Sequence, residues 1–211
     1  FATAVVARYL LNPYLIVLET RDAGALIRDR SEVVQDATSS DVLNLNDFST
    51  LANGDVLYIG SHLPFRGVRV DVTNTNSTAS VLTVTYWNGS AWTDITVTDG
   101  SDNGGASFGV DGNASWTVPT AWAAESLAKI LDLPVTRAPH MDTKLFWTRW
   151  VFRVALDASV TVANLLALNR STTYDEMVAG QAVESEDDEG KGGPGGIGCV
   201  EALTDAGRIS H

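Results

Sequence analysis

An Asn-Gly pair stands between two β-branched and aromatic runs in residues 80–97, S-V-L-T-V-T-Y-W-N-G-S-A-W-T-D-I-T-V. Asn88 and Gly89 both tolerate the positive φ that a two-residue type I′ turn requires. The stretch therefore predicts a β-hairpin that turns at this pair. A longer loop that also takes in Ser90 and Ala91 is the alternative. A chain organised around such a hairpin is constrained to a fold in which β-strands pair.

Further strand patterns recur at the spacing of about 8–12 residues that sandwiches and barrels show. In residues 67–73, Val68, Val70 and Val72 alternate with Arg69 and Asp71, which predicts one buried face and one solvent-facing face. We therefore expect an all-β fold, an antiparallel β-sandwich of jelly-roll-like type. The remaining expected strands cover residues 14–20, 25–28, 42–45, 55–59, 106–110, 114–118, 145–156 and 159–168.

The pattern changes after Pro119, where residues 120–127 (T-A-W-A-A-E-S-L) predict one short helix capped by Thr120. Residues 133–142 contain Pro134 and Pro139 and predict a surface loop. Three segments are expected along the chain. These are an extended N-terminal arm (residues 1–13), the β-sandwich domain (residues 14–170) and an acidic, Gly-rich C-terminal arm (residues 171–211).

The C-terminal arm departs sharply in composition from the strands. It contains an acidic run, followed by G-K-G-G-P-G-G at residues 190–196. In isolation such a segment buries too little apolar area to offset its chain entropy, so we expect it to become ordered only against a neighbouring subunit. The predicted assembly contacts are the carboxylates of the acidic run, Glu184, Glu186, Asp187, Asp188 and Glu189.

Charge and composition exclude several classes of protein. The formal net charge of −12 argues against direct nucleic-acid binding, because counterion release needs a basic patch. No apolar run approaches the roughly 18 residues that cross a bilayer, so no membrane contact is expected. The single cysteine, Cys199, excludes an internal disulfide framework. No signal peptide is expected, and because Phe1 is not an initiator we expect the native start to be processed or numbered differently.

Candidate catalytic and metal-binding patterns are weak. The histidines, His62, His140 and His211, do not stand at ligand spacing, and no G-x-S-x-G elbow occurs. Residues 99–104 (D-G-S-D-N-G) are similar to the start of a calcium loop, but Val110 stands where the bidentate Glu is required. We therefore expect no enzymatic activity, no cofactor and no bound metal.

The tryptophans allow two interpretations. Trp87, Trp92 and Trp116 lie close to expected turns, where exposed rings can stack on sugars as in carbohydrate-binding modules. The alternative, which we favour, is packing in the rim or core, where an aromatic pair stabilises by about 0.5–1.5 kcal/mol beyond its area burial. Trp150 and Phe152 share one face of the strand expected over residues 145–156 and are predicted to lie in the core.

Arg149 and Arg153 share the other face of that strand. A half-buried arginine needs a carboxylate partner, because an unpaired charge is costly to remove from water. Asp71 and Asp94 are the expected partners, within the subunit or across a contact. Structural ion pairing is favoured over recognition of a ligand.

Five stretches carry a family likeness. They are L-E-T-R-D-A-G-A-L (residues 18–26), L-Y-I-G-S-H-L-P-F-R-G-V-R-V-D-V (57–72), T-V-T-Y-W-N-G-S-A-W-T (83–93), W-T-V-P-T-A-W (116–122) and F-W-T-R-W-V-F-R-V (146–154). In order and spacing they resemble small β-sandwich virion structural proteins of tailed bacteriophages. Arg66 stands where members of that group tend to have a carboxylate, and the insert at residues 129–142 is longer than theirs.

The resemblance implies a non-enzymatic structural component of a tailed-phage virion, in the first instance a capsid decoration protein, with arms that contact neighbouring subunits. A neck or tail component of the virion, and a carbohydrate-binding module used in host adsorption, are the alternatives. The expected partners are major capsid or neck and tail subunits and further copies of the chain. The expected location is the virion.

Overall fold

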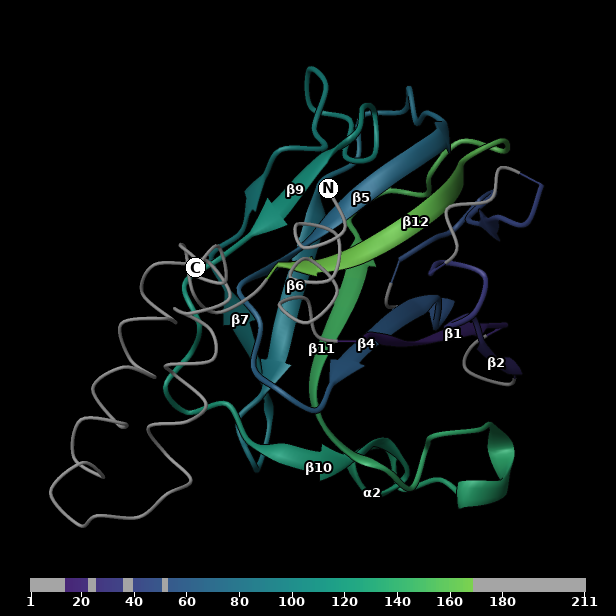
Figure 1. Cartoon of the computed structure of the whole chain (residues 1–211). Helices are drawn as coiled ribbons and strands as arrows, with labels where there is room; N and C mark the ends of the chain where they lie inside the picture. The colour runs from purple at the N-terminus through teal and green to yellow at the C-terminus, as the bar shows by residue number, and fades with distance from the viewer. Residues whose placement is uncertain (1–13, 23–25, 36–39, 51–52, 169–211) are drawn as a thin grey trace, which may run out of the picture. The chain divides into compact units, whose positions relative to one another are not determined.

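Two antiparallel β-sheets pack face to face in the computed structural model, which describes residues 14–22, 26–35, 40–50 and 53–168 (Figure 1). These residues all belong to the first of the two units into which the chain divides, residues 1–170 and 171–211. The predicted all-β sandwich is confirmed. The expected arms, residues 1–13 and 171–211, and with them the acidic run at residues 184–189, lie outside the described residues.

The larger sheet has seven strands. Their order is β2-β1-β4-β11-β6-β7, and β10 pairs with β11 outside this path. β-branched and aromatic residues, which suit a pleated surface, are frequent in its central strands. The bounds are β1 (Ile16–Arg21), β2 (Leu26–Asp29), β4 (Val56–Ser61), β6 (Leu82–Trp87), β7 (Trp92–Ile95), β10 (Ala124–Ser126) and β11 (Lys144–Phe152).

The smaller sheet has five strands in the order β3-β12-β5-β9-β8. Val68 and Val70 of β5 are buried and Arg69 is exposed, which confirms the predicted alternation. The bounds are β3 (Leu43–Asn44), β5 (Gly67–Asn74), β8 (Thr98–Asp99), β9 (Gly112–Ser115) and β12 (Thr161–Leu168).

The connections interlock the two sheets. β4 and β5 are consecutive strands in different sheets, and so are β11 and β12. β4 pairs with β11 in the larger sheet, and β5 pairs with β12 in the smaller one. A simple jelly roll folds one two-stranded ribbon back on itself and would pair β4 with β12. The predicted sandwich is present, but the connectivity of these four strands is not that of a jelly roll.

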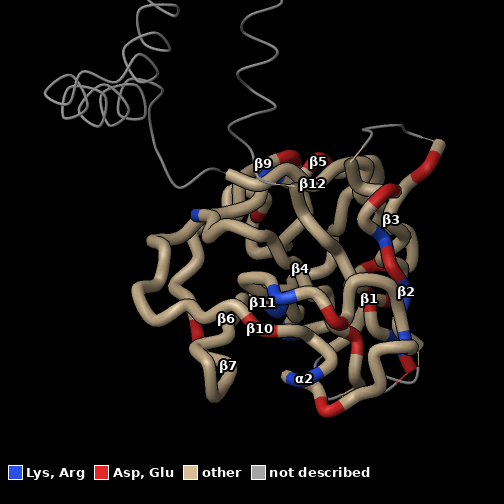
Figure 2. Tube along the Cα trace, turned by 60° about the horizontal axis from the view of Figure 1, so that its bottom comes forward, with Lys and Arg blue, Asp and Glu red and all other residues tan. Residues whose placement is uncertain are grey.

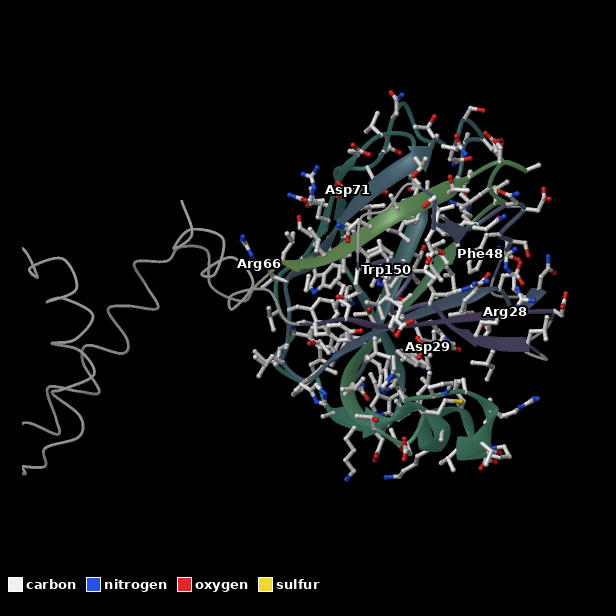
Figure 3. All side chains as sticks on the ribbon, turned by 45° about the vertical axis from the view of Figure 1, so that its right-hand side comes forward. Arg28, Asp29, Phe48, Arg66, Asp71 and Trp150 are labelled. Atoms are coloured by element: carbon white, nitrogen blue, oxygen red, sulfur yellow. The ribbon has the colours of Figure 1, made fainter. Side chains whose placement is uncertain are left out.

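Aromatic side chains run through the core between the sheets. The ring of Phe152 lies edge-on to Phe48 and Phe108, and Trp150 contacts Phe108 and Trp116. Trp150 and Phe152 are buried, as predicted for their face of the strand. Figure 3 shows Trp150 in the middle of the sandwich. Edge-to-face contacts of this kind add to the stabilisation that comes from area burial alone.

A second apolar cluster lies on the outer face of the larger sheet. Leu127 and Met141, from the segment between β10 and β11, pack with Leu18 and Trp147 of the sheet. The indole Nε1 of Trp147 donates a hydrogen bond to the carbonyl oxygen of Glu125 at 2.9 Å. The larger sheet is therefore buried on both faces over part of its width, which explains why its strands are apolar on both sides.

The short helix lies later in the chain than predicted. Residues 124–126 form β10, helix α2 covers Leu127–Leu131, and the 3-10 helix η2 (Val135–Arg137) lies in the expected loop. β10 pairs along Lys144–Phe146 of β11, so sheet pairing overrides the helical propensity of the Ala-rich segment. The residue at the helix N-cap is Ser126, and the predicted cap at Thr120 is wrong.

The hairpin turns through four residues. Trp87 pairs with Trp92, and the Asn88 N–H donates to the Ala91 carbonyl at 3.1 Å. The Asn88 side-chain oxygen accepts the Ala91 N–H at 2.8 Å. Of the loop residues only Gly89 has a positive φ, of 100°. The two-residue type I′ turn is therefore wrong and the longer loop is confirmed, because the Asn88 side chain supplies the bonds that hold the turn.

Residues 106–110 do not form the predicted strand. The Ser101 carbonyl accepts the Gly109 N–H at 2.9 Å, and the Ser101 hydroxyl accepts the Phe108 N–H at 3.1 Å. Phe108 takes a φ of 62° and points into the core. Local bonding from a serine side chain thus satisfies backbone groups that a strand would have paired. We also expected residues 106–110 to pair with residues 114–118, but β9, which overlaps the second range, pairs with β5 and β8.

Asp157 connects two loops at one end of the sandwich. Its carboxylate accepts hydrogen bonds from the N–H and the hydroxyl of Ser77, each at 2.6 Å, and from the hydroxyl of Thr78. These bonds lower the pKa of Asp157 to about 2, because they favour the ionised carboxylate.

Candidate functional site

Trp87 and Trp92 lie together at the end of the hairpin. Their ring centroids are 5.7 Å apart at an angle of 68°, so the two rings meet edge to face. The Trp92 ring also contacts Tyr58, and the Arg149 guanidinium lies 5.1 Å from its centroid. Both tryptophans are half-buried. This arrangement agrees with the favoured interpretation, packing at the rim, although both rings keep part of their surface exposed.

Trp116 is not part of that surface. It is 7% exposed and packs in the core against Trp150 and Phe65. Its indole Nε1 donates to the Phe65 carbonyl at 3.0 Å. The structure therefore does not bring the three candidate glycan-facing tryptophans together. For Trp116 the glycan-facing alternative is wrong, and the favoured interpretation, packing in the core, is confirmed.

Arg149 lies on the outer face of the larger sheet, where its Nε donates to the Thr85 hydroxyl at 3.1 Å. The strand register places Thr85 between Arg149 and Asp94, so the two charged residues stand on either side of it. Burial lowers the pKa of Arg149, and the charge of Asp94 opposes that shift. Burial also raises the pKa of Tyr58, the neighbour on β4, to about 12. Asp94 thus interacts with Arg149 electrostatically at a distance, and the two residues form no direct ion pair in the described structure.

The expected pairing of Asp71 with Arg149 or Arg153 does not occur within the subunit. Asp71 lies on β5 of the smaller sheet and accepts a hydrogen bond from Arg69 Nε at 2.8 Å. Arg153 is exposed beyond the end of β11, and only its backbone N–H is bonded, to the Val81 carbonyl, among the described residues. The two carboxylates and two arginines therefore do not form one cluster. Sequence alternation placed each residue on a face but could not say which strands share a sheet.

An open cleft of about 700 Å³ lies beside one edge strand of each sheet. β7 is an edge of the larger sheet and β8 is an edge of the smaller one. Ile95 and Val118 line the cleft and pack against the core, while Thr96 and Thr98 are exposed at its rim. Because an edge strand has unpaired N–H and C=O groups, an extended segment of another chain can add to this surface.

A pocket of about 420 Å³ lies at the opposite edge of the sandwich, beside β1, β2 and β3. Figure 2 shows that charged residues gather around these strands and are sparse around β6 and β7. The pocket contains three arginines and two carboxylates. Its lining is Glu19, Arg21, Asp22, Leu26, Arg28, Arg30, Asn44 and Asn46.

Glu19 lies at the base of this pocket and is 1% exposed. Its Oε1 accepts Arg21 Nε at 2.6 Å, and its Oε2 accepts Arg30 Nε at 2.8 Å. Arg21 also donates to the carbonyl oxygens of Asn44 and Asn46, at 3.0 and 2.9 Å, and so joins the larger sheet to the smaller. The buried carboxylate is held between two guanidinium groups, the arrangement in which a buried charge is tolerated.

The sequence contains a pattern that points to the ion pairs of Glu19, although the assignment of strands did not take it into account. In β1 and the residue before it, Leu15, Val17, Glu19 and Arg21 alternate on one face. Leu15 and Val17 are core residues, so Glu19 and Arg21 continue a core-facing row. Charged residues at core-facing positions indicate a buried ion pair, but their partner Arg30 lies beyond β2 and is set by tertiary structure.

In the described parts of the chain, no group of three or more His, Cys, Asp or Glu side chains is placed to hold a metal ion. The same residues include no helix that is long and apolar enough to cross a membrane. In comparisons with known proteins, no family model, no curated protein and no solved structure matches the chain.

Proposed function

We propose that the chain is a non-enzymatic structural component of a tailed-phage virion, a capsid decoration protein held in place by contacts with neighbouring subunits. The observation that carries this proposal is the open cleft between β7 and β8, where edge strands of both sheets lie beside a partly apolar floor. The likeness of residues 14–168 to small β-sandwich virion structural proteins supports the same class.

The mechanism would be mechanical. The aromatic core makes the sandwich a rigid unit, and the edge strands offer main-chain hydrogen bonds to an extended segment of a neighbour. In a symmetric particle each modest contact recurs many times, so avidity compensates for the small area of any one of them. A neck or tail component would use the same surfaces with different neighbours.

The position in the particle is tested by imaging. Gold-labelled antibody against the chain, applied to particles of the phage that encodes it, is expected to label the head. Label confined to the neck or tail would replace decoration with the alternative placement. Purified particles without the chain would overturn the virion role.

The cleft itself is tested by blocking it. Thr96→Arg and Thr98→Arg place long charged side chains on its exposed rim and should reduce incorporation into particles without unfolding the sandwich. Thr83→Arg is the matched control, because Thr83 is also an exposed threonine but lies on β6 and does not line the cleft. Equal incorporation of all three variants would show that the cleft is not the contact surface.

Carbohydrate binding stays a second candidate on one observation, the half-exposed Trp87–Trp92 pair beside Arg149. A glycan array or calorimetric titration tests it. Binding that disappears in Trp92→Ala would favour this candidate, whereas no binding by the wild-type chain would remove it.

A further inference from the structure

Three turns of the described chain contain the same dipeptide, Asn-Gly, at residues 53–54, 88–89 and 103–104. An asparagine before glycine can lose its side-chain amide, because glycine has no Cβ to block the approach of its backbone nitrogen to the asparagine Cγ. Whether this happens in a folded protein depends on how freely the side chain turns toward that nitrogen. The first pair adjoins residues 51–52, which lie outside the described residues, so the comparison is between the other two.

The side chain of Asn88 is held at both of its polar atoms. Its Oδ1 accepts hydrogen bonds from the N–H groups of Ser90 and Ala91, at 2.9 and 2.8 Å, and from the Ser90 hydroxyl at 3.0 Å. Its Nδ2 donates to the Thr93 hydroxyl at 2.9 Å. Asn88 is also half-buried. Because its Cγ could turn toward the Gly89 nitrogen only by breaking these bonds, the fold protects this pair.

The side chain of Asn103 is not held in this way. It is exposed and has no hydrogen-bond partner among the described residues. The backbone N–H and carbonyl of Asn103 are bonded to Ala106 at 3.0 and 3.4 Å. Gly104 and Gly105, between them, have φ of 67° and 94°, which is the φ pattern of a type I′ turn. The backbone of this turn is therefore fixed, while the asparagine side chain is free to rotate.

The nitrogen that would attack is free as well. The Gly105 N–H is bonded to Asp102 Oδ1 at 3.0 Å, whereas the Gly104 N–H has no acceptor in the described structure. A Cβ built at Gly104 would meet no described atom within 4 Å, so water and hydroxide can reach the turn. We propose that Asn103 is a site of spontaneous deamidation in the folded protein and that Asn88 is protected from the same reaction.

The reaction needs only water as a co-reactant. Hydroxide removes the proton of the Gly104 amide, and the nitrogen forms a bond to Asn103 Cγ. The bond from Cγ to Nδ2 breaks, and the side-chain nitrogen leaves as ammonia after taking a proton from water, so that a five-membered cyclic imide remains. Water then opens the imide at one of its two carbonyls. Opening at Cγ gives aspartate and opening at the backbone carbonyl gives isoaspartate, and either product adds one negative charge.

Isoaspartate at this position would change the turn itself. The main chain then passes through the former side chain and gains one carbon atom, so positions 103 and 106 lose the spacing that their two hydrogen bonds need. Ala106 is buried and forms a bridge to Ser80, so we expect the loop between β8 and β9 to loosen after the reaction. The inference is independent of the proposed function, because it concerns the chemistry of one turn.

Peptide mapping by mass spectrometry tests the proposal on the folded, full-length chain after incubation in mildly alkaline buffer. We expect aspartate and isoaspartate to accumulate at position 103 roughly tenfold faster than at position 88, close to the factor that one net hydrogen bond is worth. The same incubation in guanidinium chloride is the control. Both residues precede glycine, so their rates should converge once the fold is lost. Equal rates in the folded chain, faster reaction at Asn88, or an equally large difference in the denatured chain would overturn the proposal.

Variants of the protecting bonds test the cause. Thr93→Val removes the hydroxyl that accepts from Asn88 Nδ2 but keeps a β-branched residue in β7, and it should accelerate deamidation at position 88 severalfold. Ser90→Ala, a change at an exposed loop residue, removes one donor to Asn88 Oδ1 and gives the same test if Thr93→Val does not fold. Asn103→Gln would need a six-membered ring and should abolish the change at position 103. An unchanged rate at position 88 in folded variants would refute the protective role of these bonds.

Discussion

Gly60 stands where the outer face of the larger sheet has no room for a side chain. It lies on β4 directly opposite Trp147 of β11. A Cβ built at Gly60 would lie 2.5, 2.7 and 2.8 Å from three carbons of the Trp147 indole. Trp147 is fully buried, and its Nε1 is bonded to the Glu125 carbonyl, so the ring cannot move without breaking that bond or shifting the segment above it.

Gly60→Ala is therefore expected to destabilise the protein. Ordinary contact begins at 3.4 Å, so the 2.5 Å approach requires a displacement of about 0.9 Å. Overpacking of a close-packed core costs about 1–3 kcal/mol, while replacing glycine by alanine in a strand recovers about 0.5–1 kcal/mol of backbone entropy. The difference between these two ranges is about 0–2.5 kcal/mol, and because the required displacement is large we expect a net loss in its upper half.

Urea unfolding followed by far-UV circular dichroism measures this loss. The midpoint should fall while the slope m stays constant, because the surface exposed on unfolding is unchanged. The decisive comparison repeats Gly60→Ala in a Trp147→Leu background, where the colliding ring is absent. There the alanine should be neutral or stabilising, and an equal loss in both backgrounds would refute the steric explanation.

Three further predictions follow from buried and bonded groups. Asp157→Asn should lower the melting temperature at neutral pH. Because the folded pKa of Asp157, about 2, lies below the ordinary 3.8, the difference from wild type should shrink as the pH falls from about 4 to about 2, and a gap independent of pH in thermal scans would contradict this. Glu19→Ala leaves two guanidinium groups without their shared carboxylate and should cost about 3–5 kcal/mol in urea unfolding, so a loss under about 1 kcal/mol would show that water replaces it. Trp150→Ala should cost about 3–5 kcal/mol by opening a cavity in the aromatic core, and Trp150→Phe clearly less in the same assay.

Strand β5 and the hairpin of β6 and β7 show which structural features the local sequence pattern predicts and which it does not. Alternation of side chains has a period of two, so the sequence alone assigned Val68 and Val70 to the core and Arg69 to solvent. The turn between β6 and β7 was placed correctly but given the wrong length. Backbone preference at Asn88 and Gly89 allows a two-residue turn, and only the hydrogen bonds made by the folded loop select the longer one.

The charged residues of the candidate surfaces show that the sequence alone does not predict which strands share a sheet. Asp71 and Arg149 each lie on the outward face of a strand, but the strands belong to different sheets, and no local signal states this. In the same way Trp116 follows a short strand near a turn, yet it fills the core because Phe65 and Trp150 meet there.

The sequence by itself determined that this protein is an all-β sandwich, which residues of β5 face inward, and that the acidic run differs from everything before it. These properties depend on side-chain alternation and composition, which are local. Tertiary structure alone decided that Glu19 lies between Arg21 and Arg30, that Arg28 stands without an acceptor among the described residues, and that β7 and β8 border one cleft. These properties depend on which distant segments meet, and chain entropy and packing settle that only for the folded chain as a whole.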